Sequence, residues 1–188
     1  AGFQLWIEAR ILEAIQSRMQ SSANNRRRKV VLYNPVSLFF DMPLALLAIG
    51  SVLDADRYEV IIIDGRIEAD APGKIRSCIQ GAVCFGVTVL TGSPLRDALA
   101  MSELVKAAAP DVPVIWGGWH ASLFPLQPLQ DEPCIDITVQ GQGELTFQEL
   151  VGRLDAKQAL DGLLGICFRK DGKIVQNMPR ALADMDTF

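Results

Sequence analysis

The feature that most constrains the fold of this chain is a regular alternation between short apolar runs and longer segments of helical character, which begins at Val30. The apolar runs carry almost no polar interruption, so each is typical of a strand buried on both faces. Strands of this kind that alternate with helices predict a parallel sheet covered by helices on both sides. The five predicted strands are Val30–Tyr33, Tyr58–Ile63, Ala82–Val87, Val112–Trp116 and Ile135–Val139.

The segments between these runs predict the helices of the same plan. One helix begins near Pro43, because proline suits a first helical turn, and a long one over Pro94–Ala109 ends before Pro110. Shorter helices are predicted over Pro72–Ile79 and Leu145–Leu154. Units of this size match a flavodoxin-like, doubly wound α/β fold, whose five parallel strands have the order 2-1-3-4-5.

A Rossmann dinucleotide-binding domain is the competing plan, and it requires a glycine-rich turn after the first strand. The turn here is Asn34-Pro35-Val36-Ser37, which contains no glycine. The segment Gly141-Gln142-Gly143 follows the last strand instead and lacks the third glycine of the fingerprint. The sequence therefore favours the flavodoxin-like plan.

Both ends of the chain depart from this rhythm. Residues 1–20 carry apolar side chains at helical spacing, which predicts an amphipathic helix, and the basic run Arg26–Lys29 follows. Near the other end, Asp171-Gly172 lies between Leu164–Arg169 and Lys173–Gln176, which predicts a β-hairpin. We therefore divide the chain into a helix with a basic linker (residues 1–29), an α/β domain (residues 30–160) and a hairpin with a further linker (residues 161–188).

The composition excludes several classes of protein. The chain has 18 basic and 22 acidic residues, and a net charge of −4 argues against nucleic acid as the main partner. Its four cysteines form no CxxC pair, which excludes a zinc ribbon, a thioredoxin-type motif and an iron–sulfur ligand cluster. With one histidine and few acid–base groups on the expected rim, we assign no catalytic residue and no metal ligand to this chain.

The sequence also bears on the compartment. The N-terminus has charges inside its apolar part and no small-residue cleavage site, so no secretory signal is expected. Two uncharged stretches, Ser77–Leu95 and Val112–Gln130, contain glycine, proline and polar residues, which suit buried strands and loops better than a bilayer span. Isolated cysteines are typical of a reducing compartment. We expect a cytoplasmic protein without a membrane span.

In an open α/β sheet, ligands bind outside the carboxyl ends of the strands, where the strand order reverses. The loops at this rim cover residues 34–41, 88–93, 117–122 and 140–144. The second supplies hydroxyl groups and a small apolar floor, whereas Gly117-Gly118 and Gly141–Gly143 let the backbone approach a ligand closely. Each glycine pair alone also suits an ordinary turn. Together the loops predict a large, flat ligand that forms hydrogen bonds.

These segments, in their order and spacing, resemble the N-terminal cobalamin-binding domain of cobalamin-dependent radical S-adenosylmethionine enzymes. That family includes class B methylases and anaerobic magnesium-protoporphyrin ester cyclases. The resemblance covers residues 30–186, and it makes the hairpin with Asp184-Met185-Asp186 similar to the connector into a catalytic barrel. The matching segments are VLYNP at 31–35, the apolar helix from Pro43, YEVIIID at 58–64, GVTVLT at 86–91, GGWH at 117–120 and GQGELT at 141–146.

The resemblance implies which residues hold the cofactor. It places Thr88 and Leu90 under the corrin, Gly117 and Gly118 against the nucleotide tail, and the loop at 141–144 over the same tail. The cofactor-binding residues that it implies are Thr88, Val89, Leu90, Thr91, Gly117, Gly118, Trp119, His120, Gly141, Gly143 and Glu144.

Two differences from related families refine this interpretation. Cobalamin domains of the mutase and methionine-synthase type carry Asp-x-His-x-x-Gly after the first strand, with the histidine on cobalt, whereas Asp41–Leu46 contains no histidine. The resemblance thus implies base-off cobalamin without a histidine ligand. The CxxxCxxC motif of the radical domain is also missing. S-adenosylmethionine and an iron–sulfur cluster would then belong to a catalytic domain that follows these 188 residues.

The leading hypothesis is a non-catalytic cobalamin module of a radical enzyme that performs methyl transfer or related chemistry. The alternatives are a flavodoxin-like domain that binds a nucleotide, a flavin or a protein partner, and a small stand-alone enzyme. His120 either bonds the ligand or is a solvated loop residue, and Trp119 is a candidate to pack on the ligand. Glu144 is stabilised by the helix dipole with or without a ligand. Trp116 and Cys84 are predicted to lie in the core.

Overall fold

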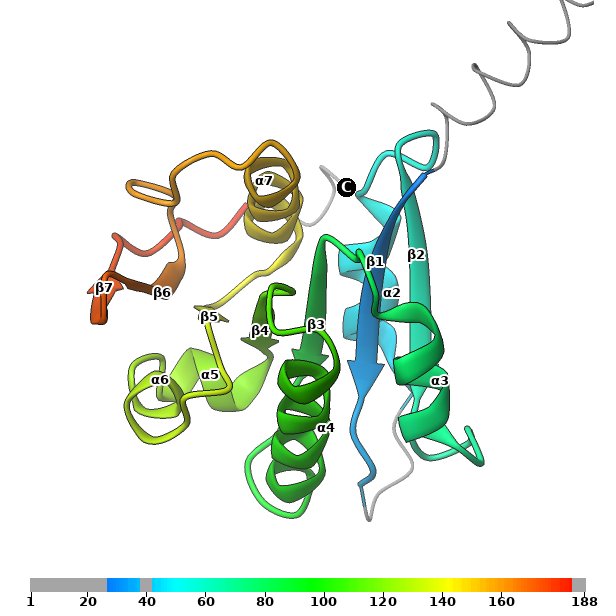
Figure 1. Cartoon of the computed structure of the whole chain (residues 1–188). Helices are drawn as coiled ribbons and strands as arrows, with labels where there is room; N and C mark the ends of the chain where they lie inside the picture. The colour runs from blue at the N-terminus through cyan, green and yellow to red at the C-terminus, as the bar shows by residue number, and fades with distance from the viewer. Residues whose placement is uncertain (1–26, 38–41, 184–188) are drawn as a thin grey trace, which may run out of the picture.

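The strands that the structure describes form one seven-stranded sheet, in the order β2-β1-β3-β4-β5-β6-β7 (Figure 1). The structure is a computed structural model that describes residues 27–37 and 42–183. The predicted helix over residues 1–20, the start of the basic linker and the segment Asp184–Asp186 lie outside the described residues. Predictions for those segments therefore stay predictions.

The central part of the sheet confirms the predicted parallel order 2-1-3-4-5. Each strand begins within two residues of its predicted start, because the apolar runs that predict the strands also fill the two buried faces. Val30, Val31 and Leu32 are fully buried and Tyr33 is 1 % exposed. The five strands are β1 (Arg28–Asn34), β2 (Tyr58–Asp64), β3 (Cys84–Thr88), β4 (Val114–Gly117) and β5 (Ile137–Val139).

The predicted hairpin forms, and it continues the same sheet. Strands β6 (Ile166–Lys170) and β7 (Lys173–Gln176) are joined by Asp171 and Gly172, whose φ angles of 51° and 73° are typical of a two-residue hairpin turn. Strand β6 pairs antiparallel with β5, with Ile137 opposite Phe168. The sequence predicts the hairpin itself but not its place beside β5.

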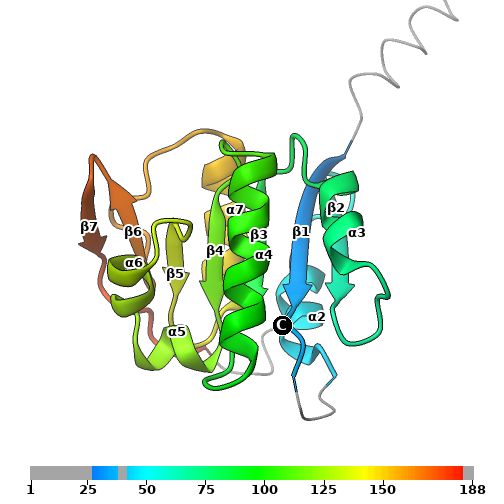
Figure 2. The same cartoon turned by 60° about the horizontal axis from the view of Figure 1, so that its bottom comes forward.

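Helices cover both faces of the sheet, with α3 and α4 in front of it and α2 and α7 behind it in Figure 2. The helix starts follow local chemistry: Asp70 caps α3 by accepting a 2.9 Å hydrogen bond from the Gly73 amide, and Pro94 is the first residue of α4. Among the helices of the described residues, none combines the length and apolarity that a bilayer span requires. These helices are α2 (Leu44–Ser51), α3 (Ala71–Cys78), α4 (Pro94–Ala108) and α7 (Glu144–Asp155).

Two short helices, α5 (Trp119–Leu123) and α6 (Gln127–Asp131), correct the prediction of a rim loop over residues 117–122. Gly118 has a φ of 87°, which turns the chain sharply after β4. The amide of His120 then donates a 3.0 Å hydrogen bond to the Val89 carbonyl. The strand therefore leads directly into a helical turn instead of an open loop.

The core consists of two layers, one on each face of the sheet. Neighbouring residues of β3 alternate between them, so Phe85 packs under α3 and α4 whereas Cys84 packs toward α2 and α7. Cys84 is fully buried and Trp116 is 3 % exposed, which confirms both predicted core positions. The indole Nε1–H of Trp116 donates a 2.9 Å hydrogen bond to the Ser102 hydroxyl.

Candidate ligand-binding site

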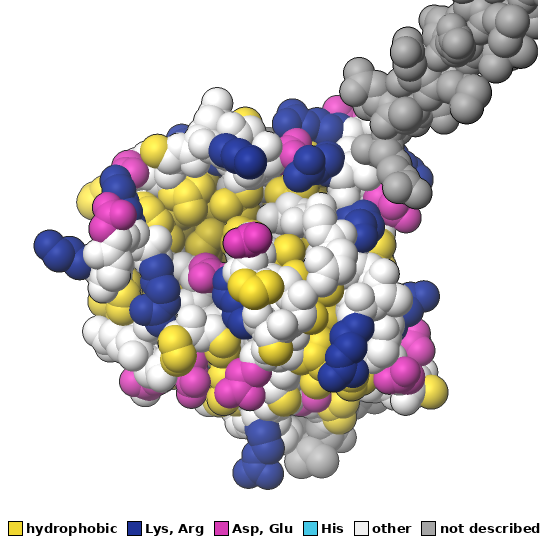
Figure 3. Space-filling model, in the orientation of Figure 1, with side chains coloured by type: hydrophobic (Ala, Val, Ile, Leu, Met, Phe, Trp, Pro, Cys, Tyr) yellow, Lys and Arg dark blue, Asp and Glu magenta, His cyan; other side chains and the backbone are white. Residues whose placement is uncertain are grey.

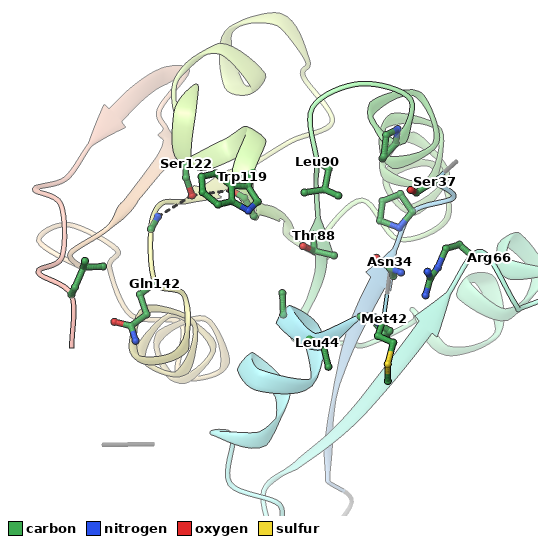
Figure 4. Close-up of a pocket in the computed structure, with 17 residues that line it drawn as sticks. Asn34, Ser37, Met42, Leu44, Arg66, Thr88, Leu90, Trp119, Ser122 and Gln142 are labelled. Carbon is green, nitrogen blue, oxygen red and sulfur yellow. Dashed lines mark hydrogen bonds between the residues drawn. The ribbon is translucent and has the colours of Figure 1, made fainter. Parts of the chain in front are cut away.

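A wide cavity of about 460 Å³ opens at the carboxyl ends of β1, β3 and β4, which is the edge predicted for the ligand (Figure 4). Its walls come from the loops after the strands, the first turn of α2 and the start of α5. The lining residues are Asn34, Pro35, Ser37, Met42, Pro43, Leu44, Ala45, Arg66, Thr88, Leu90, Pro94, Gly118, Trp119, Ser122, Gly141, Gln142 and Leu182.

One side of this cavity is polar. The Arg66 guanidinium pairs with the Asp64 carboxylate at 2.7 Å, and both side chains are about nine-tenths buried. The Asn34 amide donates to the same carboxylate at 3.2 Å. The hydrogen bond from Arg66 lowers the pKa of Asp64 despite its burial. This side of the cavity thus carries a fixed, internally balanced ion pair.

The loop after β1 is held by Asp97 of α4. Its carboxylate accepts a 2.7 Å hydrogen bond from the Tyr33 hydroxyl and a 2.8 Å hydrogen bond from the Val36 amide. Burial, followed by the nearby Asp97, raises the pKa of Tyr33, so this hydroxyl stays a donor. The loop after β1, which borders the polar side of the wide cavity, is therefore anchored to α4.

The remaining wall of the wide cavity is apolar and open to solvent. Trp119 is 69 % exposed, Leu44 60 % and Met42 57 %. In Figure 4 these side chains and Leu90 surround the hollow, with Thr88 near its centre. Exposed apolar groups gathered around one cavity are typical of a ligand site, because they gain from burial when the site is filled.

A second, narrower cavity of about 210 Å³ lies between the sheet and helices α2 and α7. It adjoins the wide cavity, since both are lined by Ala45, Thr88, Gly118, Gly141 and Gln142. The other residues that line the narrow cavity are Leu46, Ile49, Gly86, Val87, Ile115, Gly117, Val139, Gly143, Glu144 and Phe147.

The glycines that line the narrow cavity differ in how much space surrounds them. A Cβ atom built on Gly117 meets no atom within 4 Å, so the absent side chain leaves open space. A Cβ on Gly86 comes to 2.8 Å from the end of Leu32 and 3.6 Å from the Phe147 ring. Gly118 differs, because its Cβ would approach the backbone of Val89 to 3.0 Å. Gly117 thus leaves space for a ligand, whereas Gly86 lets Leu32 pack closely and Gly118 avoids a contact with the Val89 backbone.

Hydrogen bonds fix the two rim loops relative to each other. The Ser122 hydroxyl donates to the Gly118 carbonyl at 2.8 Å and accepts from the Gly141 amide at 3.0 Å. Figure 4 draws the second of these bonds beside the cavity. Gln142 accepts a 2.8 Å hydrogen bond from the Ala183 amide, so the segment after the hairpin also reaches the rim.

Glu144 is the first residue of α7 and lines the narrow cavity. Its Oε2 atom is buried and accepts no hydrogen bond from the described residues. A buried carboxylate oxygen without a donor costs free energy, on the order of 1–3 kcal/mol or more. Glu144 thus carries one buried oxygen whose hydrogen-bonding capacity the described residues do not use.

The structure brings eight of the eleven predicted cofactor-binding residues to these two cavities and leaves three outside. Those in the cavities are Thr88, Leu90, Gly117, Gly118, Trp119, Gly141, Gly143 and Glu144. The three that line neither cavity are Val89, which is fully buried, Thr91 and His120.

His120 lies instead beside a shallow third cavity on the face of α4, α5 and α6. Its Nδ1 atom is 3.2 Å from the Thr91 hydroxyl, and its ring centroid is 5.4 Å from that of Phe124. Burial lowers the pKa of His120, so the neutral ring is favoured. His120 and Thr91, two of the predicted cofactor-binding residues, thus contact each other and line neither of the two joined cavities.

Several lining residues were not predicted from the sequence. Arg66 follows the second strand by two residues, and the loop after that strand is not among the predicted rim loops although it lies at the same carboxyl edge of the sheet. Phe147 belongs to an ordinary amphipathic stripe. Gly86 was open to prediction, because a glycine inside an apolar strand often marks a close approach of a ligand or backbone.

Within residues 27–37 and 42–183, no group of three His, Cys, Asp or Glu side chains is placed to hold a metal ion. All four cysteines are free and buried. Burial raises the pKa of Cys84 to about 12 and that of Cys134 to about 11, which keeps both thiols protonated at neutral pH.

Known proteins with similar sequences include methyltransferases and a cyclase. The chain is 34 % identical over 142 residues to an uncharacterized methyltransferase of Pyrococcus horikoshii, and 27 % identical over 153 residues to the anaerobic magnesium-protoporphyrin IX monomethyl ester cyclase of Synechocystis. These matches cover 74 % and 78 % of this chain. They span only 30 % of each relative's own length.

Solved structures share the fold. The radical S-adenosylmethionine methyltransferase TsrM from Kitasatospora setae, solved with cobalamin and a [4Fe-4S] cluster, superposes with a TM-score of 0.72 at 22 % identity. That match covers 85 % of this chain and 30 % of TsrM. The cobalamin-dependent S-adenosylmethionine radical enzyme OxsB gives a TM-score of 0.69 at 18 % identity, over 86 % of this chain and 23 % of OxsB.

A protein-family model matches more than half of the chain. The model of the B12 binding domain matches residues 37–151, which include β2 to β5, helices α2 to α6 and most of α7. This range also contains most of the residues that line the two joined cavities. The chain belongs to the B12 binding domain family.

Proposed function

We propose that this domain holds cobalamin in the base-off form, without a histidine ligand to cobalt. In this arrangement the corrin ring lies over the wide cavity and the nucleotide tail enters the narrow one. The observation that carries the proposal is the junction of the two cavities at Thr88, Gly118 and Gly141, since one ligand with a broad part and a slender part can fill both.

The residues present fit such a ligand. The exposed apolar surfaces of Trp119, Met42 and Leu44 offer a platform for a large ring. Open space at Gly117 admits a slender group, and the polar residues Thr88 and Glu144 line the same cavity. The single histidine, His120, bonds Thr91 and lines neither joined cavity, which supports a histidine-free mode of binding.

When bound, cobalamin would supply the methyl transfer or related chemistry, together with the radical domain. The residues of this chain bind and orient it: the apolar wall excludes water from one side, while Asn34 and the Arg66–Asp64 pair offer fixed polar groups on the other. The domain therefore acts as a holder, and we assign no proton transfer to its side chains.

We further propose that this domain is one module of a cytoplasmic radical S-adenosylmethionine enzyme, followed in the same polypeptide by the radical domain. The names of TsrM and OxsB and the partial coverage of both support this context. The free, buried thiols are consistent with a reducing compartment. Sequencing the native gene beyond Phe188 tests the proposal. A CxxxCxxC motif is expected there, and a gene that lacks one contradicts it.

The binding proposal is tested with hydroxocobalamin. The purified 188-residue chain is mixed with it and desalted, and its visible spectrum is compared with that of free cobalamin at neutral pH and in strong acid. We expect retained colour and a spectrum close to the acid, base-off form. A colourless protein overturns cobalamin binding, and a base-on spectrum overturns the base-off mode alone. Flavin mononucleotide is the control ligand, and we expect it to leave the melting temperature unchanged.

A further inference from the structure

After β7 the chain turns back and runs along helix α7 to the rim of the wide cavity. We call residues 177–183, which follow β7 directly, the strap, and Figure 1 shows them in red between β7 and α7. The Asn177 amide donates a 3.0 Å hydrogen bond to the Ile166 carbonyl, and the Met178 carbonyl accepts one of 2.8 Å from the Gly165 amide. The strap is therefore anchored at its start, where it continues the pairing of the hairpin.

Arg180 holds the middle of the strap on α7. Its guanidinium donates to the Thr146 hydroxyl at 2.8 Å and to the Glu149 carboxylate at 2.5 Å. Thr146 is fully buried and the Arg180 side chain is 21 % exposed, so these contacts are partly shielded from water. Hydrogen bonds from a charged donor are stronger than neutral ones. Arg180 is thus the side chain that joins the strap to the helix.

The end of the strap belongs to the wall of the wide cavity. Leu182 lines this cavity, although its side chain is 80 % exposed. The amide of Ala183 donates a 2.8 Å hydrogen bond to the side chain of Gln142, which lines both joined cavities. An exposed leucine at the edge of a cavity gains from burial when a ligand covers it. The strap therefore brings an apolar side chain of its own to the site.

We propose that Arg180 is a positioning residue for cobalamin: it holds the strap on α7 and thereby keeps Leu182 in the wall of the wide cavity, where the corrin ring covers it. The inference rests on the proposed cobalamin binding, and it adds a segment outside residues 37–151, which the family model matches. A released strap has to be ordered again when the ligand binds, so its release lowers the affinity. By linkage, bound cobalamin in turn stabilises the strap.

The first test measures dissociation constants for hydroxocobalamin and for cobinamide, which lacks the nucleotide, with the 188-residue chain. We expect Arg180→Ala to weaken binding of both ligands by roughly 10-fold, the effect of losing charge-assisted hydrogen bonds. Arg180→Lys keeps the charge beside Glu149 and is expected to lose less. Leu182→Ala should weaken both by roughly 3- to 10-fold through lost apolar contact. Met178→Ala is the matched control, because Met178 is 73 % exposed on the same strap and lines neither joined cavity.

Hydrogen exchange separates positioning from a merely structural role. Deuterium uptake of a peptide that covers the strap is measured by mass spectrometry with and without hydroxocobalamin. We expect the ligand to slow this exchange in the wild type, and the protection to be weaker in Leu182→Ala. If Arg180→Ala lowers the melting temperature, Leu182→Ala carries the test, because its exposed side chain contributes little to the packing of the fold.

The outcomes distinguish this inference from the proposed function. Wild-type affinity in both Arg180→Ala and Leu182→Ala overturns the inference and leaves cobalamin binding in place. Strap exchange that hydroxocobalamin does not slow in the wild type has the same meaning. A wild type that binds neither hydroxocobalamin nor cobinamide overturns the proposed function, and the inference with it.

Discussion

The two faces of the sheet are built from the same strands and differ in how completely they are filled. On the face of α3 and α4, Phe85 of β3 belongs to a continuous buried cluster. On the face of α2 and α7, the same strand presents Gly86, and a cavity of about 210 Å³ remains beside it. Figure 3 adds that basic and acidic side chains are interspersed over the visible surface. The comparison indicates that this site consists of space left unfilled in one layer of the core, not of added reactive groups.

The largest expected effect is a loss of stability when a cavity is created on the face of α3 and α4. Phe85 is fully buried and its ring centroid lies 6.1 Å from that of Tyr33. We expect Phe85→Ala to lower the free energy of unfolding by about 3–5 kcal/mol, because it creates a new cavity in a packed layer. Urea unfolding measures this loss.

The matched change on the other face is Phe147→Ala. Phe147 is as well buried but already borders a cavity, so it has fewer packing contacts to lose. We expect a smaller loss of stability than for Phe85→Ala, together with weaker cobalamin retention. Equal stability losses, with cobalamin retention unaffected in both variants, would remove the distinction between the faces.

The next effect comes from filling the open face. Gly117 has open space around its missing Cβ and needs no left-handed backbone, so Gly117→Phe is expected to fold normally. Its ring would occupy the narrow cavity and reduce cobalamin affinity by roughly 100-fold or more, which corresponds to about 2.7 kcal/mol. Titration followed by visible absorbance measures the affinity.

Gly152→Phe is the control, because Gly152 is equally open and lies outside both joined cavities. It should retain cobalamin. Gly118 is unsuitable for this test, since its Cβ would press on the Val89 backbone and disturb the fold directly. Full retention by Gly117→Phe would show that the tail does not enter the narrow cavity.

A smaller effect is expected from the polar contact inside the filled face. The Ser102 hydroxyl accepts from Trp116 and donates to the Ala98 carbonyl at 2.7 Å, and it is fully buried. Ser102→Ala leaves the indole N–H unpaired, so we expect a loss of about 1–3 kcal/mol in the free energy of unfolding. Cobalamin affinity should not change. An affinity loss without a stability loss would mean that this face contributes to the site.

The smallest effect concerns His120. Burial lowers its pKa in the folded state, so the unfolded chain binds a proton first as the pH falls below about 6.5. The wild type should therefore lose a little stability between that pH and the lower folded pKa, and His120→Ala should lack this component. The spectrum of bound cobalamin should be identical in both. A changed spectrum in His120→Ala would place the histidine within reach of the cofactor.

Much of the fold was predictable from the sequence because the signals were local. The continuous apolar run Val30–Tyr33 suits a strand buried on both faces, and Asp171-Gly172 suits the turn of a hairpin. The rim loops also follow from topology, since the carboxyl ends of parallel strands meet at one edge. Those arguments place Thr88, Gly118 and Gly141 at the rim, and in the structure these residues line both cavities.

The rest depended on contacts that no local pattern carries. The side of the rim to which His120 belongs is set by the sharp turn at Gly118 and the short helix that follows. Arg66 lines the wide cavity because its partner Asp64 ends the neighbouring strand, and position 86 requires a glycine because Leu32, from a distant segment, packs against it. Tertiary packing decides each of these.

The hairpin has a consequence for the wall of the narrow cavity. Strand β5 has only three residues, Ile137–Val139, and would fray if it were the edge of the sheet. Instead β4 pairs with it on one side and β6 on the other, so the edge lies two strands away. We expect the β5 amides to exchange with deuterium slowly even without ligand. The wall at Val139 is then preorganised, and little conformational entropy is lost when the tail enters.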